Sequence, residues 1–167
     1  KQPYDFIRDL LIAENGDVSI IKFSMSEENL RRVLAHPLVV IASDGYSLAP
    51  YGELGAGKPH LRNYGTFTRI LRKYVREEKT LTLPQAIRKM TSLSAMKFGL
   101  KDRGFIRRGC FADITIFNPD TVSDREDWMN PHQYSVGVEY VIVNGKIVIE
   151  KGEHSGALPG RCLRRGM

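Results

Sequence analysis

The sequence has 167 residues, and its 25 Lys and Arg outnumber its 19 Asp and Glu to give a net charge of +6. Its hydrophobic content of 42% is enough for a folded core, and no run reaches the roughly 20 apolar residues of a membrane span. The length excludes a complete (β/α)₈ barrel, which needs about 250 residues. Two cysteines and a start without a signal-like segment predict a cytoplasmic protein with reduced thiols.

The first part of the chain predicts a helix, a strand and a second helix. Apolar residues at helical spacing predict a helix over residues 4–14, which Asn15-Gly16 would end. The β-branched run over residues 18–23 predicts a strand. Directly after it, Ser24-Met25-Ser26-Glu27 resembles a capping box, and the helix that follows would end at His36-Pro37.

A second predicted strand and a long loop follow that helix. Residues 38–42 form the continuous apolar run typical of a strand that is buried on both faces. Strands that alternate with helices favour a parallel sheet, open or closed. Residues 45–65 are rich in Gly, Pro and Tyr and predict a loop, which lies at the strand end where α/β folds place their chemistry.

The rest of the chain predicts two helices and then a separate β unit. One helical face repeats from Phe67 to Val75, and a second helix begins with the capping-box pattern Thr82-Leu83-Pro84-Gln85. After Gly99 the pattern becomes extended, and Asn144-Gly145 between two β-branched runs predicts a hairpin. The extended segments of this unit are residues 104–106, 112–117, 140–143 and 146–149.

Two short motifs contain residues that could act on a ligand. Ser43-Asp44-Gly45 closes the second predicted strand, so Asp44 could bind a metal or take a proton from an attacking water. It could equally cap the next turn. His60-Leu61-Arg62 lies in the long loop, where Arg62 suits bidentate binding of a carboxylate. Taken alone, an ordinary solvated loop accounts for this second motif better.

Other patterns do not complete a site. The four histidines show no H-x-H or H-E-x-x-H spacing, and Cys110 and Cys162 are too far apart for a zinc knuckle. The segment from Gly52 to Lys58 lacks the spacing of a phosphate-binding loop. Basic residues gather on the helix predicted from Phe67 and at residues 161–165, and a solvated face explains them better than nucleic-acid binding does.

Longer motifs join these features into one pattern between about Ser24 and Arg165. Residues 102–117, followed by the hairpin at 141–148, resemble the closing β-domain of the amidohydrolase superfamily. Within that superfamily the chain resembles the N-acyl-D-amino-acid deacylases. The motifs that carry this second resemblance are His36-Pro37, Ser43-Asp44-Gly45, Tyr64-Gly65-Thr66-Phe67-Thr68-Arg69-Ile70-Leu71, Lys89-Met90-Thr91-Ser92-Leu93, Phe98-Gly99-Leu100 and Pro159-Gly160-Arg161-Cys162-Leu163.

The resemblance implies a zinc-dependent hydrolase that cleaves an N-acyl-D-amino acid into a carboxylate and a free D-amino acid. Residues 38–43 are similar to the last barrel strand of the family, and Asp44 matches the aspartate that faces the metal and handles the proton of the attacking water. Arg62 matches the arginine that pairs with the substrate carboxylate, and His60 lies beside it. Leu61 stands where the family usually has proline. The other metal ligands of the family, histidines and a cysteine on earlier strands, have no counterpart here.

The sequence therefore predicts the α/β class, as the C-terminal part of a (β/α)₈ TIM-barrel amidohydrolase with strands of a small β-sandwich domain. Residues 1–103 would form the last strands and helices of the barrel, and residues 104–167 the C-terminal segment of the β-domain. The predicted cofactor is zinc, with Asp44 as one ligand. The predicted partners are an N-acyl amino acid and the N-terminal part of the same enzyme, with no nucleic acid or membrane. The chain alone should be inactive.

Two alternatives to this function stay open. One is a related amidohydrolase of other specificity, such as a dihydroorotase-like cyclic amidase or an N-acyl-D-glutamate-specific enzyme. The other is a basic module that binds nucleic acid, which would show a steep salt dependence.

Overall fold

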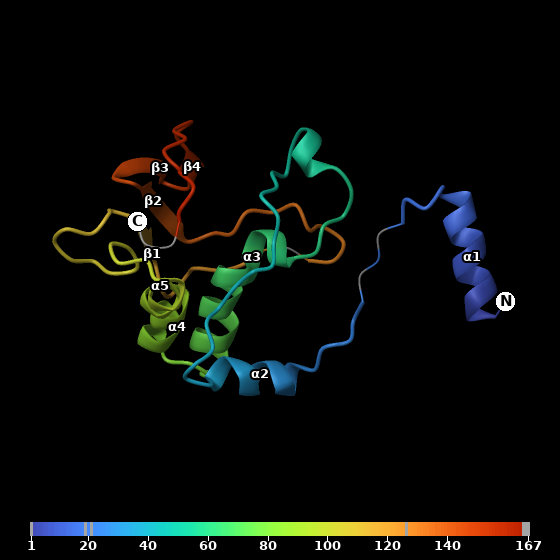
Figure 1. Cartoon of the computed structure of the whole chain (residues 1–167), viewed down its shortest axis with the longest axis horizontal. Coiled ribbons are helices and arrows are strands. Elements are labelled where there is room, and N and C mark those ends of the chain that lie inside the picture. Colours follow the sequence, from blue (N-terminus) through green and yellow to red (C-terminus); the bar gives the residue numbers. More distant parts are fainter. Residues whose placement is uncertain (1, 19, 21, 126, 165–167) are drawn as a thin grey trace.

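The computed structural model describes residues 2–18, 20, 22–125 and 127–164, with helices in the earlier part of the chain and strands in the later part. The helical elements are α1 (Pro3–Ala13), α2 (Glu27–Ala35), the 3₁₀ turn η1 (Glu53–Gly55), α3 (Arg62–Arg69), the π-helical segment η2 (Ile70–Glu77), α4 (Leu83–Met90) and α5 (Ser92–Phe98). A four-stranded antiparallel sheet follows, in the order β1 (Ile114–Phe117), β2 (Val138–Val143), β3 (Lys146–Glu150) and β4 (Glu153–His154). Figure 1 shows α2 to α5 grouped below the sheet and α1 separate from them.

The predicted helices are confirmed, with shifts at their ends. Helix α1 matches the helix predicted over residues 4–14. Helix α2 starts after Ser26, whose Oγ accepts a hydrogen bond from the Asn29 N–H at 3.1 Å, so Ser26 and not Ser24 is the cap. The capping box at Thr82 is present with both of its hydrogen bonds.

The two strands predicted before residue 45 are wrong for the residues that are described. Within 18–23, residues 18, 20, 22 and 23 lie in no strand, and residues 19 and 21 fall outside the described part. Residues 38–42 form no strand either, and the Ile41 N–H donates instead to the Lys89 carbonyl at 3.3 Å. A strand needs a neighbouring strand for its backbone hydrogen bonds, and the described residues before 103 offer none. The predicted parallel sheet is therefore absent from the described residues.

The β unit begins later than predicted, but its hairpin is confirmed. Residues 104–106 form no strand, because Gly104 turns with a φ of +81° close to α5, where an added Cβ would lie 2.7 Å from the Ala95 Cβ. Asn144 and Gly145, between β2 and β3, have φ values of +49° and +79°. Positive φ at both positions is the geometry of the turn that Asn-Gly favours in a two-residue hairpin.

The core lies among the helices and takes in one buried residue from the β unit. Its buried members are Leu34, Ile41, Ile70, Leu71, Tyr74, Leu81, Ala86 and Val122. Val122, which is 0% exposed, lies between β1 and β2 in the chain, so packing crosses the predicted boundary between residues 103 and 104. Gly137 permits this packing, because a Cβ there would lie 2.5 Å from the Val122 Cα.

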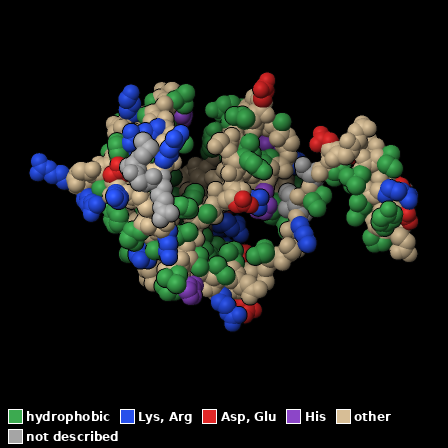
Figure 2. All heavy atoms as spheres, viewed as in Figure 1, with side chains coloured by type: hydrophobic (Ala, Val, Ile, Leu, Met, Phe, Trp, Pro, Cys, Tyr) green, Lys and Arg blue, Asp and Glu red, His purple; other side chains and the backbone are tan. Residues whose placement is uncertain are grey.

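The prediction of a solvated basic face on the helix from Phe67 is wrong, because Arg72 and Lys73 on this helix pair with acidic residues. Arg72 donates from Nε and Nη2 to the carboxylate of Asp124, at 2.5 and 3.0 Å. Lys73, whose side chain is 18% exposed, lies 2.9 Å from the Glu27 carboxylate. Figure 2 shows Lys and Arg side chains gathered instead over the left of the molecule, around the sheet and α5. Among the described helices, none is long and apolar enough to cross a membrane.

Candidate active site

The structure brings Asp44 and Arg62 together, although a long loop separates them in the chain. Asp44 has a φ of +52°, in the left-handed region, which an aspartate tolerates better than most residues do. Arg62 begins helix α3, and its Nη2 lies 3.1 Å from the Asp44 Oδ2. Both side chains face solvent, with 86% of Asp44 and 41% of Arg62 exposed. The pair is therefore accessible to a ligand from outside.

His60 lies beside this pair and holds the backbone of Arg62. Its Nδ1 accepts a hydrogen bond from the Arg62 N–H at 3.1 Å, which requires that nitrogen to carry no proton. Burial and the charge of Arg62 lower the pKa of His60, and the charge of Asp44 opposes them only in part. A neutral His60 is thus the acceptor for a backbone N–H in the first turn of α3, where helices leave such groups unpaired.

Asn63 joins the segment that follows Asp44 to the segment at His60. Its Oδ1 accepts from the Tyr46 N–H at 2.6 Å, and its Nδ2 donates to the His60 carbonyl at 2.7 Å. The two segments approach so closely that a Cβ on Gly45 would lie 3.1 Å from the Asn63 Cα. Asn63 was not predicted from the sequence, because no motif marks a side chain that bonds two separate backbone segments.

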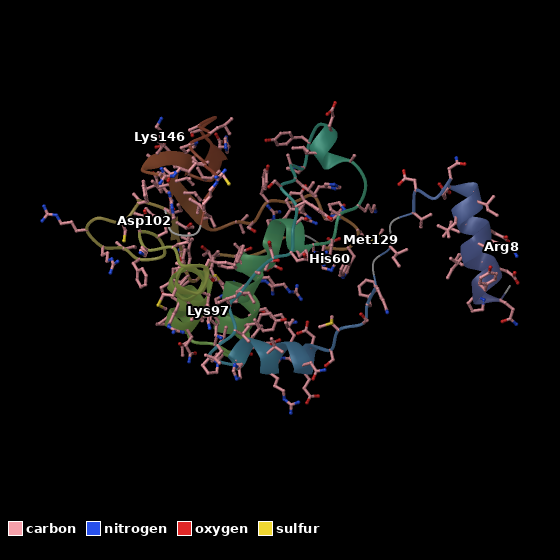
Figure 3. All side chains as sticks on the ribbon, in the orientation of Figure 1. Arg8, His60, Lys97, Asp102, Met129 and Lys146 are labelled. Carbon is pink, nitrogen blue, oxygen red and sulfur yellow. The ribbon has the colours of Figure 1, made fainter. Side chains whose placement is uncertain are left out.

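Trp128 is a second site residue that was not predicted from the sequence. It is the single tryptophan of the chain and lies between β1 and β2, far from the site in sequence. Its ring meets the His60 ring edge-on, with 5.1 Å between centroids and an interplanar angle of 84°. Figure 3 labels His60 and Met129 and shows the two segments close together. The sequence around Trp128 carries no signal for the site, because nothing local to it specifies so distant a contact.

A cavity of about 400 Å³ lies next to the site. Its walls come from α2, α3, η2, residues 39–42, the His60–Arg62 segment and Trp128, and most of the lining is aliphatic. Its volume is within the range of small-molecule sites. Asp44 is not among its lining residues, so the cavity and the exposed carboxylate are neighbours rather than one pocket.

The described residues do not supply a complete metal site. No three His, Cys, Asp or Glu side chains within residues 2–18, 20, 22–125 and 127–164 come close enough together to hold an ion. Asp44 offers one carboxylate, and in this structure that carboxylate is paired with Arg62. Zinc sites in proteins take three or four protein ligands. The predicted zinc therefore does not fit this chain by itself.

The arrangement can nevertheless do two things chemically. The Asp44 carboxylate can accept a proton or contribute one ligand to a metal, and the Arg62 guanidinium can bind a carboxylate. An exposed ion pair contributes about 0–1 kcal/mol to stability. A carboxylate of a ligand can therefore replace Asp44 as the partner of Arg62 at little cost in free energy.

Residues 6–149 match the amidohydrolase family. The N-acyl-D-glutamate deacylase of Alcaligenes xylosoxydans xylosoxydans is 43% identical over 145 residues, which are 87% of this chain and 28% of that protein. The N-acyl-D-aspartate deacylase of the same organism is 40% identical over 156 residues, 93% of this chain and 30% of that protein. Dihydroorotases of Lactobacillus match less, at 26% to 30% identity over 97 or 98 residues.

Solved structures give the same grouping. A crystal structure of D-aminoacylase aligns with 86% of this chain and 29% of its own, at 38% identity and a TM-score of 0.78. A second structure is the N-acyl-D-glutamate deacylase from Bordetella bronchiseptica, complexed with zinc and a phosphonate mimic of the tetrahedral intermediate. It aligns with 75% of this chain and 25% of its own, at 42% identity and a TM-score of 0.68. The chain belongs to the amidohydrolase family, as its motifs predicted. It spans about 30% of the length of the curated relatives that it matches.

Proposed function

We propose that this chain is the C-terminal portion of an enzyme that hydrolyses the amide bond of N-acyl-D-amino acids. The observation that carries the proposal is the convergence of Asp44 and Arg62, a proton acceptor and a carboxylate receptor, at 3.1 Å on an accessible edge of the molecule. A substrate that has an amide and a carboxylate needs a proton acceptor for the hydrolysis of its amide and a cationic group that binds its carboxylate. The deacylases of D-glutamate and D-aspartate derivatives among the relatives support this substrate class.

In this proposal Asp44 handles the proton of the reaction. It takes one proton from water as the water oxygen bonds to the amide carbon, and it returns that proton to the nitrogen as the C–N bond breaks. The second proton of the water stays on the new carboxyl group and then passes to the amine or to solvent. The products are a carboxylate and a free D-amino acid, and Asp44 ends in its starting state. Its exposure supports the role, because a carboxylate without a buried partner is free to meet a bound substrate.

Arg62 binds the carboxylate of the substrate and so fixes the amide relative to Asp44. The guanidinium can turn from Asp44 to a substrate carboxylate, and Arg62 then still has one carboxylate partner. His60 acts beside it by holding the Arg62 backbone, as its hydrogen bond of 3.1 Å supports. The binding of substrate thereby frees the Asp44 carboxylate at the moment when the reaction requires it.

Zinc belongs to the proposal for the full-length enzyme and not to this chain alone. Asp44 would be one ligand, and the other ligands would come from residues outside this sequence. The zinc in the Bordetella deacylase structure and the binuclear centre described for D-aminoacylase support a metal-dependent enzyme. Because no cluster of side chains in the described part of the chain forms a metal site, the contribution of this chain is limited to Asp44 and to the binding of substrate.

The architecture of the full-length enzyme is also part of the proposal. Residues 1–103 would complete a (β/α)₈ barrel, with 38–42 becoming a strand once neighbouring strands are present, and residues 104–167 would join a β-sandwich. The TM-score of 0.78 to D-aminoacylase supports this view. A cytoplasmic location is supported by the free thiols of Cys110 and Cys162.

The test is an assay of the full-length enzyme, loaded with zinc, against paired N-acetyl-D- and N-acetyl-L-amino acids, with release of the free amino acid as the readout. We expect turnover of D-substrates and none by the isolated 167-residue chain. Absence of D-substrate turnover by the full-length enzyme would contradict the proposal. Rapid turnover by the isolated chain would contradict the claim that its active site is incomplete.

A dihydroorotase-like cyclic amidase is the second candidate, because Lactobacillus dihydroorotases match about half of the chain. The same assay decides between the two when dihydroorotate is included as a substrate. Preference for the cyclic amide over every N-acyl-D-amino acid would favour this second function.

A further inference from the structure

We infer that Trp128 is a positioning residue for Arg62: it fixes the His60 ring, and through that ring the segment from which Arg62 reaches the substrate carboxylate. The inference rests on the proposed function. It adds a residue from the segment between β1 and β2 to a site otherwise built from residues 43–63.

The aromatic contacts of Trp128 point toward the site. Its ring lies edge-on to His60, at 5.1 Å and 84°, and edge-on to Phe23, at 4.8 Å and 74°. Edge-to-face pairs at these distances are attractive beyond the area they bury. Trp128 is still 40% exposed, so burial in the core is not what holds it in place. Of its two ring contacts, the one with His60 joins Trp128 to the segment that carries Arg62.

The turn that carries Trp128 is tightly constrained. The Asp127 carboxylate accepts hydrogen bonds from the Met129 and Asn130 N–H groups, at 2.7 and 2.8 Å, and these bonds lower the pKa of Asp127. Lys58, two residues before His60, donates from Nζ to the Met129 carbonyl at 3.2 Å. The turn and the His60 segment are therefore joined at two points, one polar and one aromatic.

The contact continues from His60 to Arg62 and Asn63. The His60 Nδ1 accepts from the Arg62 N–H, and the His60 carbonyl accepts from the Asn63 amide. If the ring rotated, the Arg62 N–H would lose its acceptor at the first turn of α3. A fixed ring therefore fixes the start of the helix that aims the Arg62 guanidinium at Asp44.

The test uses the full-length enzyme, an N-acetyl-D-amino acid that the wild type hydrolyses, and the same compound with its carboxylate replaced by a primary amide. Trp128→Ala should raise KM for the carboxylate about fivefold with kcat unchanged, and leave KM for the amide unchanged, because only the carboxylate uses Arg62. Trp128→Phe should restore most of the loss, because it keeps an aromatic edge. Phe98→Ala, an exposed aromatic on α5, is the control and should change neither.

Equal losses for carboxylate and amide, or an unchanged KM in Trp128→Ala, would overturn the positioning role. If Trp128→Ala does not fold, Lys58→Met replaces it, because this change removes only the polar tether. An increase of about twofold in KM for the carboxylate alone supports the role, and no change overturns it. A wild type that hydrolyses no N-acyl-D-amino acid overturns the proposed function and this inference with it. A wild type that does so leaves the inference to be judged by the variants.

Discussion

Two aspartate–arginine pairs in this chain have the same chemistry and opposite surroundings. Asp44 is 86% exposed and meets Arg62 at 3.1 Å, whereas Asp124 is 4% exposed and accepts two hydrogen bonds from Arg72. An exposed pair contributes about 0–1 kcal/mol, and removal of one partner from a buried pair costs about 3–5 kcal/mol. The difference indicates that Asp44 is held loosely enough to act on a ligand, while Asp124 holds the β unit to η2.

The largest expected effect is on catalysis, in Asp44→Asn. We expect kcat of the full-length enzyme to fall about 10³-fold, because the amide that replaces the carboxylate cannot accept a proton. The melting temperature should stay within about 2 °C of the wild type, since the pair is exposed. Steady-state kinetics and thermal unfolding on the same samples check both. A kcat within about tenfold of the wild type would contradict the assignment of Asp44.

The opposite result is expected for Asp124→Asn. Its free energy of unfolding in urea should fall by about 2–3 kcal/mol, because Arg72 loses its buried partner but keeps Glu77. KM and kcat of the folded enzyme should remain close to wild type. A loss of activity without a loss of stability would reverse the roles of the two aspartates.

The free energy of unfolding should depend more steeply on acidic pH in the wild type than in the Asp124→Asn variant. Burial disfavours the charge of Asp124, but hydrogen bonds from Arg72 outweigh it, so the pKa lies below its ordinary value of 3.8. A depressed folded-state pKa stabilises the protein at pH above 3.8, and that contribution is lost as the pH falls through the folded-state value. Urea unfolding between about pH 5 and pH 3 should therefore show a steeper decline in wild type than in Asp124→Asn. If the free energy of unfolding fell in parallel with pH in the two proteins, the proposed link between the ionisation of Asp124 and stability would be contradicted.

The smallest effect is expected in Asn63→Ala, which removes the bridge between the Asp44 and His60 segments. We expect KM for the carboxylate substrate to rise about threefold and stability to fall by about 1 kcal/mol, the usual size for lost hydrogen bonds. Asn63→Asp tests the geometry further, because it keeps the acceptor for the Tyr46 N–H and loses the donor to the His60 carbonyl. An Asn63→Ala enzyme with wild-type kinetics would show that the bridge is dispensable.

The sequence predicted what depends on local pattern and on family motifs. It predicted the helices, the Thr82 capping box, the Asn144-Gly145 hairpin and the family to which the chain belongs. It failed for residues 38–42, since a continuous apolar run becomes a strand only beside another strand. The motifs led to Asp44, His60 and Arg62, but not to Asn63 or Trp128. These two make contacts between segments distant in the chain, which no local pattern encodes.

The most direct test of the proposed site is the ratio of kcat/KM for a carboxylate substrate to that for its primary amide, measured in wild-type and Arg62→Gln full-length enzyme. If Arg62 leaves Asp44 to bind the substrate carboxylate, the substitution should lower this ratio at least about tenfold and leave the amide rate nearly unchanged. An unchanged ratio in Arg62→Gln would show that Arg62 pairs only with Asp44 and does not bind the substrate.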